Sequence, residues 1–457
     1  MLNKISKGCV NVMQRLLPDP FIFCIILTVF VFLVAMPLTG QGPVEMFNHW
    51  GNGVWGLLAF SMQMALVLVF GTAFATAPAV KKFLQTLALV PKTPFQAIFF
   101  VTFISTMACW LNWGFGLIVG AILAKETAKV MKKVDYRLLI ASAYSGFVVW
   151  HAGISGSVPL TIAGTSEAEI AAMSKQTAGV ITSTIPIGNT VFAGWNLIAC
   201  LAILVILPLV NAKMHPSEKE TFIVDPAILL DEERVYKKPE TPAEKMENSM
   251  LLSYCVVAIG GAYIIYQIVK GTFNLNLDTV NLIFLVLGVA FHKTPIRYVD
   301  AVADAAKGAA GIILQFPFYA GIQGLMVGAN AVTGASFAGV ISNAFVAIAT
   351  PVTFPLFTFW SAGIVNFFVP SGGGQWAVQA PIMLPAAAKL GVSPALTSMA
   401  IAWGDAWTNL LQPFWALPAL GLAKLGAKDI MGYCLVGLVV SGVIVSACLL
   451  AAGAFGM

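Results

Sequence analysis

Charge is what this sequence has least of. Of its 457 residues, 10% are Asp, Glu, Lys or Arg, and no charged residue lies between Gly308 and Ala388. A soluble globular domain has about 25% charged residues, so this composition excludes an ordinary soluble fold. A hydrophobic content of 59% and a mean hydropathy of +0.87 indicate instead a chain whose length lies mostly inside a membrane.

Paired cysteines and catalytic signatures are also missing. The seven cysteines stand singly, without metal-ligand spacing, so they predict neither a metal site nor a disulfide framework. His151, Ser155 and Asp405 form a nominal catalytic set, but no nucleophile elbow or zinc-protease motif accompanies them. We therefore predict that the protein is not an enzyme and needs no cofactor.

The net charge of +5 does not indicate a nucleic-acid partner. The basic residues lie in short loops beside apolar segments, where they act as topology signals and the partner is membrane lipid. The arm Met1 to Asp19 carries Lys4, Lys7 and Arg15, so the amino terminus is expected in the cytoplasm.

Long apolar runs fill the rest of the chain and predict an all-α integral membrane protein of about nine transmembrane helices. The expected crossings are Phe21–Pro37, Val54–Lys82, Leu138–Ile162, Ile185–Val210, Met250–Val269, Val280–Phe291, Gly308–Val327, Pro394–Ala423 and Met431–Ala452.

Two further apolar stretches are expected to be re-entrant hairpins. Phe95–Ala124 has lysines at both ends and is broken at Asn112 to Gly116, which leaves a second limb of about ten residues, too short to span. Thr353–Ala388 is broken at Asn366 to Gln375. Irregular backbone at bilayer depth is tolerated only where it is buried in protein or lines a polar cavity, so both tips are candidate binding elements.

The chain has two similar halves. A polar segment, 213–248, is the predicted cytoplasmic linker between a first membrane repeat, 1–212, and a second unit, 249–457, made of one additional helix and the second repeat. Identical residues recur in the same order in both halves, with a nearly constant separation along the chain: Phe60 with Phe316, Asn112 with Asn366, and Pro159 with Pro418. An odd number of crossings separates the halves, so the repeat is predicted to be inverted, as in secondary transporters.

Four interruptions are expected to converge on one site: the two hairpin tips and the broken segments around His151 and Asp405. Helix amino termini at the tips attract anions, and freed carbonyls suit sodium. We predict that a substrate carboxylate is bound by Asn112, Trp113, Gly114, Ser155, Gly156, Ser157, Asn366, Ser371, Gly372, Gly373, Gly374 and Gln375. A coupling ion, sodium or a proton, is assigned to Asp405, Thr408, Asn409 and Gln412, and the pocket lining to His151, Tyr319 and Trp376.

Several motifs carry a family resemblance that covers nearly the whole chain. Leu17 to Pro20, Asn112 to Gly116, Gln315 to Gln323, Asn366 to Pro381, Gly404 to Pro418 and Asp429 to Cys434 resemble those of the bacterial short-chain fatty acid transporters. The resemblance implies an inner-membrane secondary carrier for short monocarboxylates such as acetoacetate and butyrate. It also implies a distant similarity to elevator-type carriers, with a dimeric scaffold, hence a homodimer, and a moving hairpin domain.

One difference from the wider group leaves the identity of the coupling ion open. The sodium-dicarboxylate members of the wider group carry a Ser-Asn-Thr signature at each hairpin tip, and neither tip here has it. The core also has no expected Lys or Arg, which suits a substrate with one negative charge. A carrier for C4-dicarboxylates or another small organic anion, an anion channel and an intramembrane enzyme are the alternatives.

Overall fold

The computed structural model describes residues 2–16, 18–163, 179–225, 238–273 and 277–456, together with isolated positions between these ranges. Within them every regular element is helical. The amino-terminal half contains α1 (Leu2–Leu16), α2 (Pro20–Thr39), α3 (Pro43–Gly53), α4 (Leu58–Thr76), α5 (Pro78–Ala88), α6 (Pro94–Leu111), α7 (Trp113–Val130), α8 (Tyr136–Ser145), η1 (Gly146–Ala152), α9 (Ser157–Ile162), η2 (Ile187–Asn189) and α11 (Gly194–Lys213). The carboxyl-terminal half contains α13 (Pro242–Glu247), α14 (Met250–Val269), α15 (Leu277–His292), α16 (Pro295–Ala306), η3 (Lys307–Ala309), α17 (Ala310–Val327), α18 (Phe337–Val346), α19 (Phe354–Phe368), α20 (Gly372–Leu390), α21 (Pro394–Thr408), α22 (Leu417–Ala423) and α23 (Ala427–Ala454).

The prediction of a multi-pass, all-α membrane protein is confirmed. Among the described residues, eight helical stretches are long and apolar enough to cross a bilayer: Pro20–Thr39, Leu58–Thr76, Pro94–Leu111, Tyr136–Ile162, Gly194–Lys213, Met250–Val269, Pro295–Val327 and Ala427–Ala454. Two expected crossings fall outside this set, because α15 is only 16 residues long and the expected Pro394–Ala423 helix is divided into α21 and α22.

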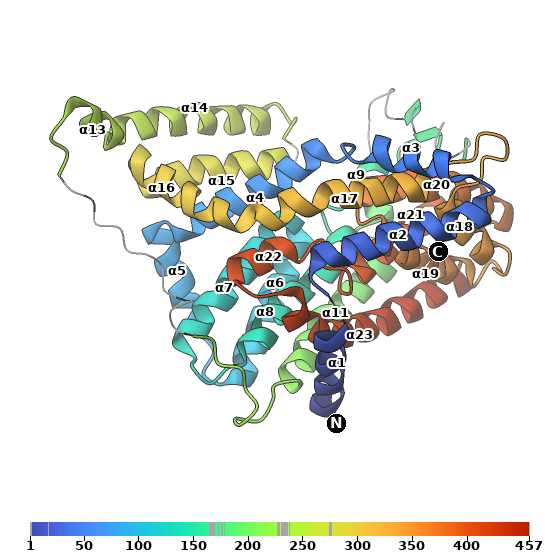
Figure 1. Cartoon of the computed structure of the whole chain (residues 1–457), viewed down its shortest axis with the longest axis horizontal. Helices are drawn as coiled ribbons and strands as arrows, with labels where there is room; N and C mark the ends of the chain where they lie inside the picture. The colour runs from blue at the N-terminus through green and yellow to red at the C-terminus, as the bar shows by residue number, and fades with distance from the viewer. Residues whose placement is uncertain are drawn as a thin grey trace.

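The long helices lie side by side. In Figure 1, α14, α15, α4, α17 and α2 run roughly parallel across the upper half of the molecule, and α14 forms its outer edge. In α14 the sole buried residue is Ser253, and apolar side chains such as Ile259 and Val269 are exposed. Such a helix is stable only where lipid or another apolar surface covers it.

The stretch expected to form the first hairpin folds as the helix pair α6 and α7, with Asn112 as the single residue between them. Asn112 has an extended backbone, and its side-chain oxygen accepts the Phe115 N–H at 2.9 Å, so it ends one helix and caps the next. Gly116 packs against the backbone of Cys109, and no Cβ would fit there, which brings the two helices together as an antiparallel pair. The second limb is longer than predicted, because α7 has 18 residues and continues through Lys125 and Lys129.

The second hairpin consists of α19 and α20. Its limbs are joined by Gln375 Nε2, which donates to the Ala362 carbonyl at 2.7 Å, and by Gln379 Nε2, which donates to Ser361 Oγ at 3.1 Å. The break is shorter than the sequence suggested. Asn366 belongs to the last turn of α19, and the glycines from Gly372 onward form the first turn of α20, so the irregular backbone is limited to 369–371.

The two broken crossings lie beside the hairpins. Residues 153–156 separate η1 from α9, and residues 409–416 separate α21 from α22. The expected helix from Ile185 begins only at Gly194, because 185–193 form a turn with the short η2. The amphipathic helix α1 and the helix α18 were not predicted.

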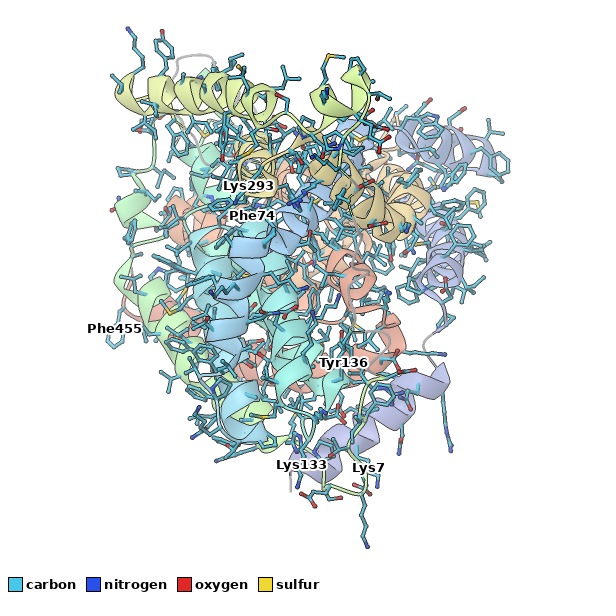
Figure 2. The ribbon with its side chains drawn as sticks, turned by 90° about the vertical axis from the view of Figure 1, so that its left-hand side faces the viewer. Lys7, Phe74, Lys133, Tyr136, Lys293 and Phe455 are labelled. Carbon is cyan, nitrogen blue, oxygen red and sulfur yellow. The ribbon has the colours of Figure 1, made fainter. Side chains whose placement is uncertain are left out.

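The predicted linker, 213–248, falls partly outside the described residues, but its first part docks on the start of α8. The Tyr136 N–H donates to the Phe222 carbonyl at 3.0 Å, and the Phe222 N–H donates to Asp135 Oδ2 at 2.7 Å. Ion pairs of Lys133 with Glu218 and of Lys7 with Glu220 add to this contact. Figure 2 shows Lys7 and Lys133 near each other at the lower end of the molecule.

Candidate functional site

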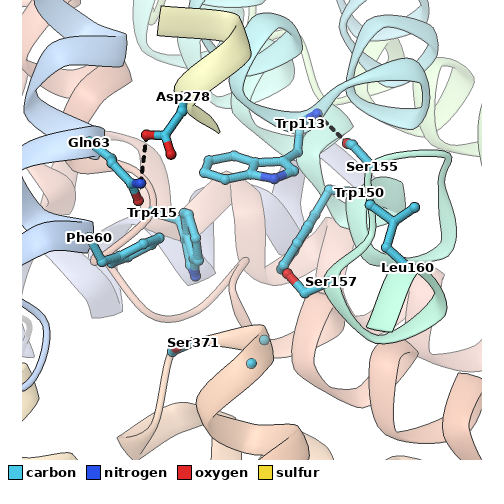
Figure 3. Close-up of a pocket in the computed structure, with 12 residues that line it drawn as sticks. Phe60, Gln63, Trp113, Trp150, Ser155, Ser157, Leu160, Asp278, Ser371 and Trp415 are labelled. Atoms are coloured by element: carbon cyan, nitrogen blue, oxygen red, sulfur yellow. Dashed lines mark hydrogen bonds between the residues drawn. The ribbon is translucent and has the colours of Figure 1, made fainter. Parts of the chain in front are cut away.

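A cavity of about 400 Å³ lies where the two hairpin tips meet the α9 break (Figure 3). This volume is within the range of small-molecule sites. Six predicted carboxylate-binding residues line it, together with six others, and the full set is Phe60, Gln63, Trp113, Trp150, Ser155, Ser157, Leu160, Asp278, Ser371, Gly372, Gly373 and Trp415.

The first tip reaches the cavity through the amino terminus of α7. Trp113 is the first helical residue, and its backbone N–H donates to Ser155 Oγ at 3.0 Å. Ser155 belongs to the broken segment before α9, so this bond ties the hairpin to that break. Asn112 and Gly114 shape the tip and do not line the cavity, and Asn112 is buried as the cap of α7.

The second tip reaches the cavity through the amino terminus of α20. Ser371 Oγ accepts the Gly374 N–H at 3.3 Å, the usual arrangement of a serine cap. A Cβ added at Gly372 would lie 2.7 Å from His151 Cε1 and 3.1 Å from Trp150, whereas one at Gly373 would meet nothing within 4 Å. Gly372 therefore allows the tip to lie directly against His151, and Gly373 faces open space.

Aromatic rings form the wall between the tips and α4. Trp415 packs edge-on against Trp113, with centroids 5.1 Å apart, and lies 5.5 Å from Trp150 and 5.8 Å from Phe60. Such a wall suits an apolar chain, and it offers no positive charge. Tyr319, an expected lining residue, is completely buried and packs on Phe414 instead.

His151 and Asp405 form a buried pair behind Gly372. His151 Nδ1 lies 2.7 Å from Asp405 Oδ2, and His151 Nε2 lies 2.9 Å from the backbone nitrogen of Val158. The Val158 N–H must donate, so Nε2 carries no proton and Nδ1 donates to the carboxylate. Both side chains are fully buried, and among the described residues Asp405 Oδ1 has no hydrogen-bond partner.

Two of the other predicted coupling-ion residues, Thr408 and Asn409, lie in a network of hydrogen bonds with Asn366. Asn366 Nδ2 donates to Thr408 Oγ1 and to Asn409 Oδ1, each at 2.9 Å. Thr408 Oγ1 donates in turn to the Gly363 carbonyl at 2.8 Å. Gln412 lies apart from these bonds and accepts the Phe414 N–H at 2.8 Å.

Several of the predicted substrate-binding and pocket-lining residues do not line the cavity in this conformation. Asn366 and Gln375 are completely buried, and neither lines the cavity. Gly156, Gly374 and Trp376 do not line it either.

Sequence reasoning did not single out Gln63, Leu160 and Asp278, and it used Phe60 only as a landmark of the repeat. Asp278 opens α15, and Gln63 Nε2 donates to its Oδ1 at 2.7 Å. An acidic residue at the start of an apolar run was a signal that could have identified it, but helix ends commonly carry acids.

The fold and the site together define a polytopic α-helical membrane protein with a cavity where two hairpin tips meet. The family model described as "Short chain fatty acid transporter" matches residues 1–451, and the chain belongs to this family. It is a transporter and not an enzyme.

Two curated relatives are similar along nearly their whole length. A protein of Escherichia coli (strain K12) named "Putative short-chain fatty acid transporter" is 43% identical over 97% of this chain and 98% of its own. A protein of the same name from Haemophilus influenzae is 44% identical over 96% and 97%. A solved structure of the Alcanivorax borkumensis YdaH transporter is 16% identical, with a TM-score of 0.42, over 96% of this chain and 99% of that one.

Proposed function

We propose that this protein is a secondary active transporter that carries short-chain monocarboxylates, such as acetoacetate and butyrate, together with sodium or a proton. The observation that supports this proposal most directly is the cavity, in which serine hydroxyls and the amino termini of α7 and α20 meet an aromatic wall. Helix amino termini and hydroxyls stabilise a carboxylate, and the rings accept a short apolar tail.

The proposed transport mechanism is elevator-type alternating access, and the two halves of the chain are proposed to form an inverted repeat. His151 and Asp405 are 254 positions apart, the same offset as Asn112 and Asn366, and they contact each other. Phe60 and Phe316, another offset pair, stack at 6.0 Å. Contacts between equivalent residues are expected near the axis that relates two repeats, so these pairs support the proposal.

The proposed setting is the bacterial inner membrane, with a cytoplasmic amino terminus and a homodimeric assembly. Lysines and arginines cluster in the loops assigned to the cytoplasm, including the turn between α7 and α8. The exposed apolar helix α14 supplies a surface that a second copy or lipid would cover.

Labelled acetoacetate and butyrate uptake into proteoliposomes tests the function. We expect accumulation above the external concentration under an imposed sodium or proton gradient, and exchange of labelled for unlabelled acid without a gradient. A carrier gives saturable counterflow, whereas a channel does not. No uptake of any short acid under either gradient would refute the proposal.

A further inference from the structure

One charged side chain lines the cavity among the described residues, and it is an acid. Asp278 belongs to the first turn of α15 and is exposed. The lining residues include no lysine or arginine. For a site that receives an organic anion, a carboxylate in the wall requires a physical explanation.

Asp278 is held at the cavity by a residue from another helix. Gln63 of α4 donates from Nε2 to Asp278 Oδ1 at 2.7 Å. An acid in the first turn of a helix is also stabilised by the helix dipole, and this role alone would need no partner on α4. The bond from Gln63 instead directs the carboxylate toward the space between α4, α7 and Trp415, as Figure 3 shows.

The two ends of the cavity differ in chemistry. Ser371 and Ser157 supply hydroxyls at one side, whereas Asp278 lies across the aromatic side chains from Ser371 (Figure 3). Phe60, Trp113 and Trp415 occupy the space between. A carboxylate would be stabilised at the hydroxyl end and an apolar tail by the rings, so the tail of an acid held at Ser371 would extend toward Asp278.

We propose that Asp278 is a specificity-determining residue that excludes dicarboxylates. A monocarboxylate bound at Ser371 presents only its apolar end to Asp278, whereas the second carboxylate of a C4 diacid would face a like charge. The inference rests on the proposed function and deepens it, since it assigns one side chain to the choice between one and two negative charges.

The size of the effect follows from Coulomb's law. Two unit charges about 4 Å apart in water repel enough to weaken binding roughly fivefold, and more strongly in a less polar cavity. Because Asp278 is exposed, mobile ions partly screen this repulsion. The dependence of diacid binding on the charge of Asp278 and on salt concentration can both be measured.

The experiment compares the wild type with Asp278→Asn in proteoliposomes at fixed pH. Labelled butyrate uptake is measured against increasing unlabelled succinate or pentanoate. We expect the succinate-to-pentanoate ratio of half-inhibiting concentrations to fall about fivefold or more in Asp278→Asn. In the wild type, potassium chloride from about 10 to 500 mM should lower the same ratio, and in the variant it should not.

Two variants serve as controls. Asp278→Glu keeps the charge and should keep a high ratio. Glu247→Gln in α13 removes one negative charge outside the cavity lining and should leave the ratio unchanged. An unchanged ratio in Asp278→Asn, or an equal fall in Glu247→Gln, would overturn the inference.

A binding measurement separates this inference from the proposed function. Thermal stabilisation of the purified protein by butyrate or succinate requires no transport. If the wild type transports butyrate but succinate stabilises it equally well, the specificity role is wrong and the function stands. If no short acid binds or is transported, both fail.

Discussion

His151 and Asp405, from the two halves of the chain, form a hydrogen bond of 2.7 Å in which neither side chain is exposed. The Val158 N–H fixes the histidine so that it donates to the carboxylate. A buried carboxylate with one neutral donor is costly, and such groups are usually retained for function. His151 lies against Gly372, which lines the cavity, so a single residue separates the pair from the cavity.

Replacing Asp405 with Asn tests its role in ion coupling. Asparagine keeps an oxygen that accepts the His151 Nδ1–H and removes the charge. We expect gradient-driven accumulation of butyrate to fall to the equilibrium level, while counterflow exchange without a gradient continues. Both are measured in proteoliposomes under sodium and proton gradients. Full gradient coupling in the variant would contradict the assignment.

Gly372→Ala tests the close contact between the second hairpin and the buried pair. The new methyl group would lie 2.7 Å from His151 Cε1, and such overpacking typically costs about 1–3 kcal/mol. We expect a lower melting temperature and a large loss of uptake.

Gly373→Ala is the matched control for stability, since its methyl group would meet nothing within 4 Å. Alanine is favoured over glycine within a helix by about 0.5–1 kcal/mol, so the melting temperature should stay or rise. Equal destabilisation by both substitutions would show that the contact with His151 is not the cause.

Ser371→Ala separates substrate binding from helix capping. Loss of the cap costs about 1 kcal/mol, and Ser393→Ala removes the equivalent cap of α21, outside the cavity lining. Both variants should lose similar stability. Only Ser371→Ala should raise the half-saturating butyrate concentration, about tenfold, since it also removes a hydroxyl from the proposed carboxylate site. A similar rise in Ser393→Ala would assign the effect to capping.

The linker contact predicts a pH dependence of stability. Burial lowers the pKa of His215 from its ordinary value of 6.5, and its neutral Nε2 accepts the Asp135 N–H at 3.1 Å. The unfolded chain then binds a proton at this histidine more readily than the folded chain does. The stability contributed by neutral His215 is therefore present above pH 6.5 and is lost as the pH falls through the pKa of His215 in the folded protein. Burial raises the pKa of Asp135, whose contribution has the opposite sign.

His215→Gln isolates the histidine, because a glutamine oxygen can accept the same N–H without titrating. Melting temperatures in detergent between pH 5 and 8 should rise more with pH in the wild type than in His215→Gln. Parallel curves would contradict this prediction.

Composition and pattern were enough to predict the membrane fold. Uniformly apolar runs predict helices, because a bilayer leaves backbone groups no other partners. The breaks near Asn112 and Ser371 were recognisable because residues that favour helix caps stand there together with glycines inside otherwise apolar runs, although Asn366, a residue of the same kind, lies within α19. The α7 limb was misjudged because lysines near a helix end were taken as its boundary, although helices continue through charged residues that reach water.

Contacts between helices that are distant in the sequence could not be predicted from the sequence. The sequence identified Ser155, Ser157, Ser371 and Asp405 as candidates, since polar groups are rare in apolar runs. It could not place Asn366 in a buried amide network, or Asp278 at the cavity, because each position depends on helices far apart in the chain. The sequence by itself determined that the chain forms long apolar helices suited to a membrane and that some of them are interrupted, since both follow from local chemistry. Only the tertiary structure decided which breaks face one another, because that is set by side-chain packing between the halves.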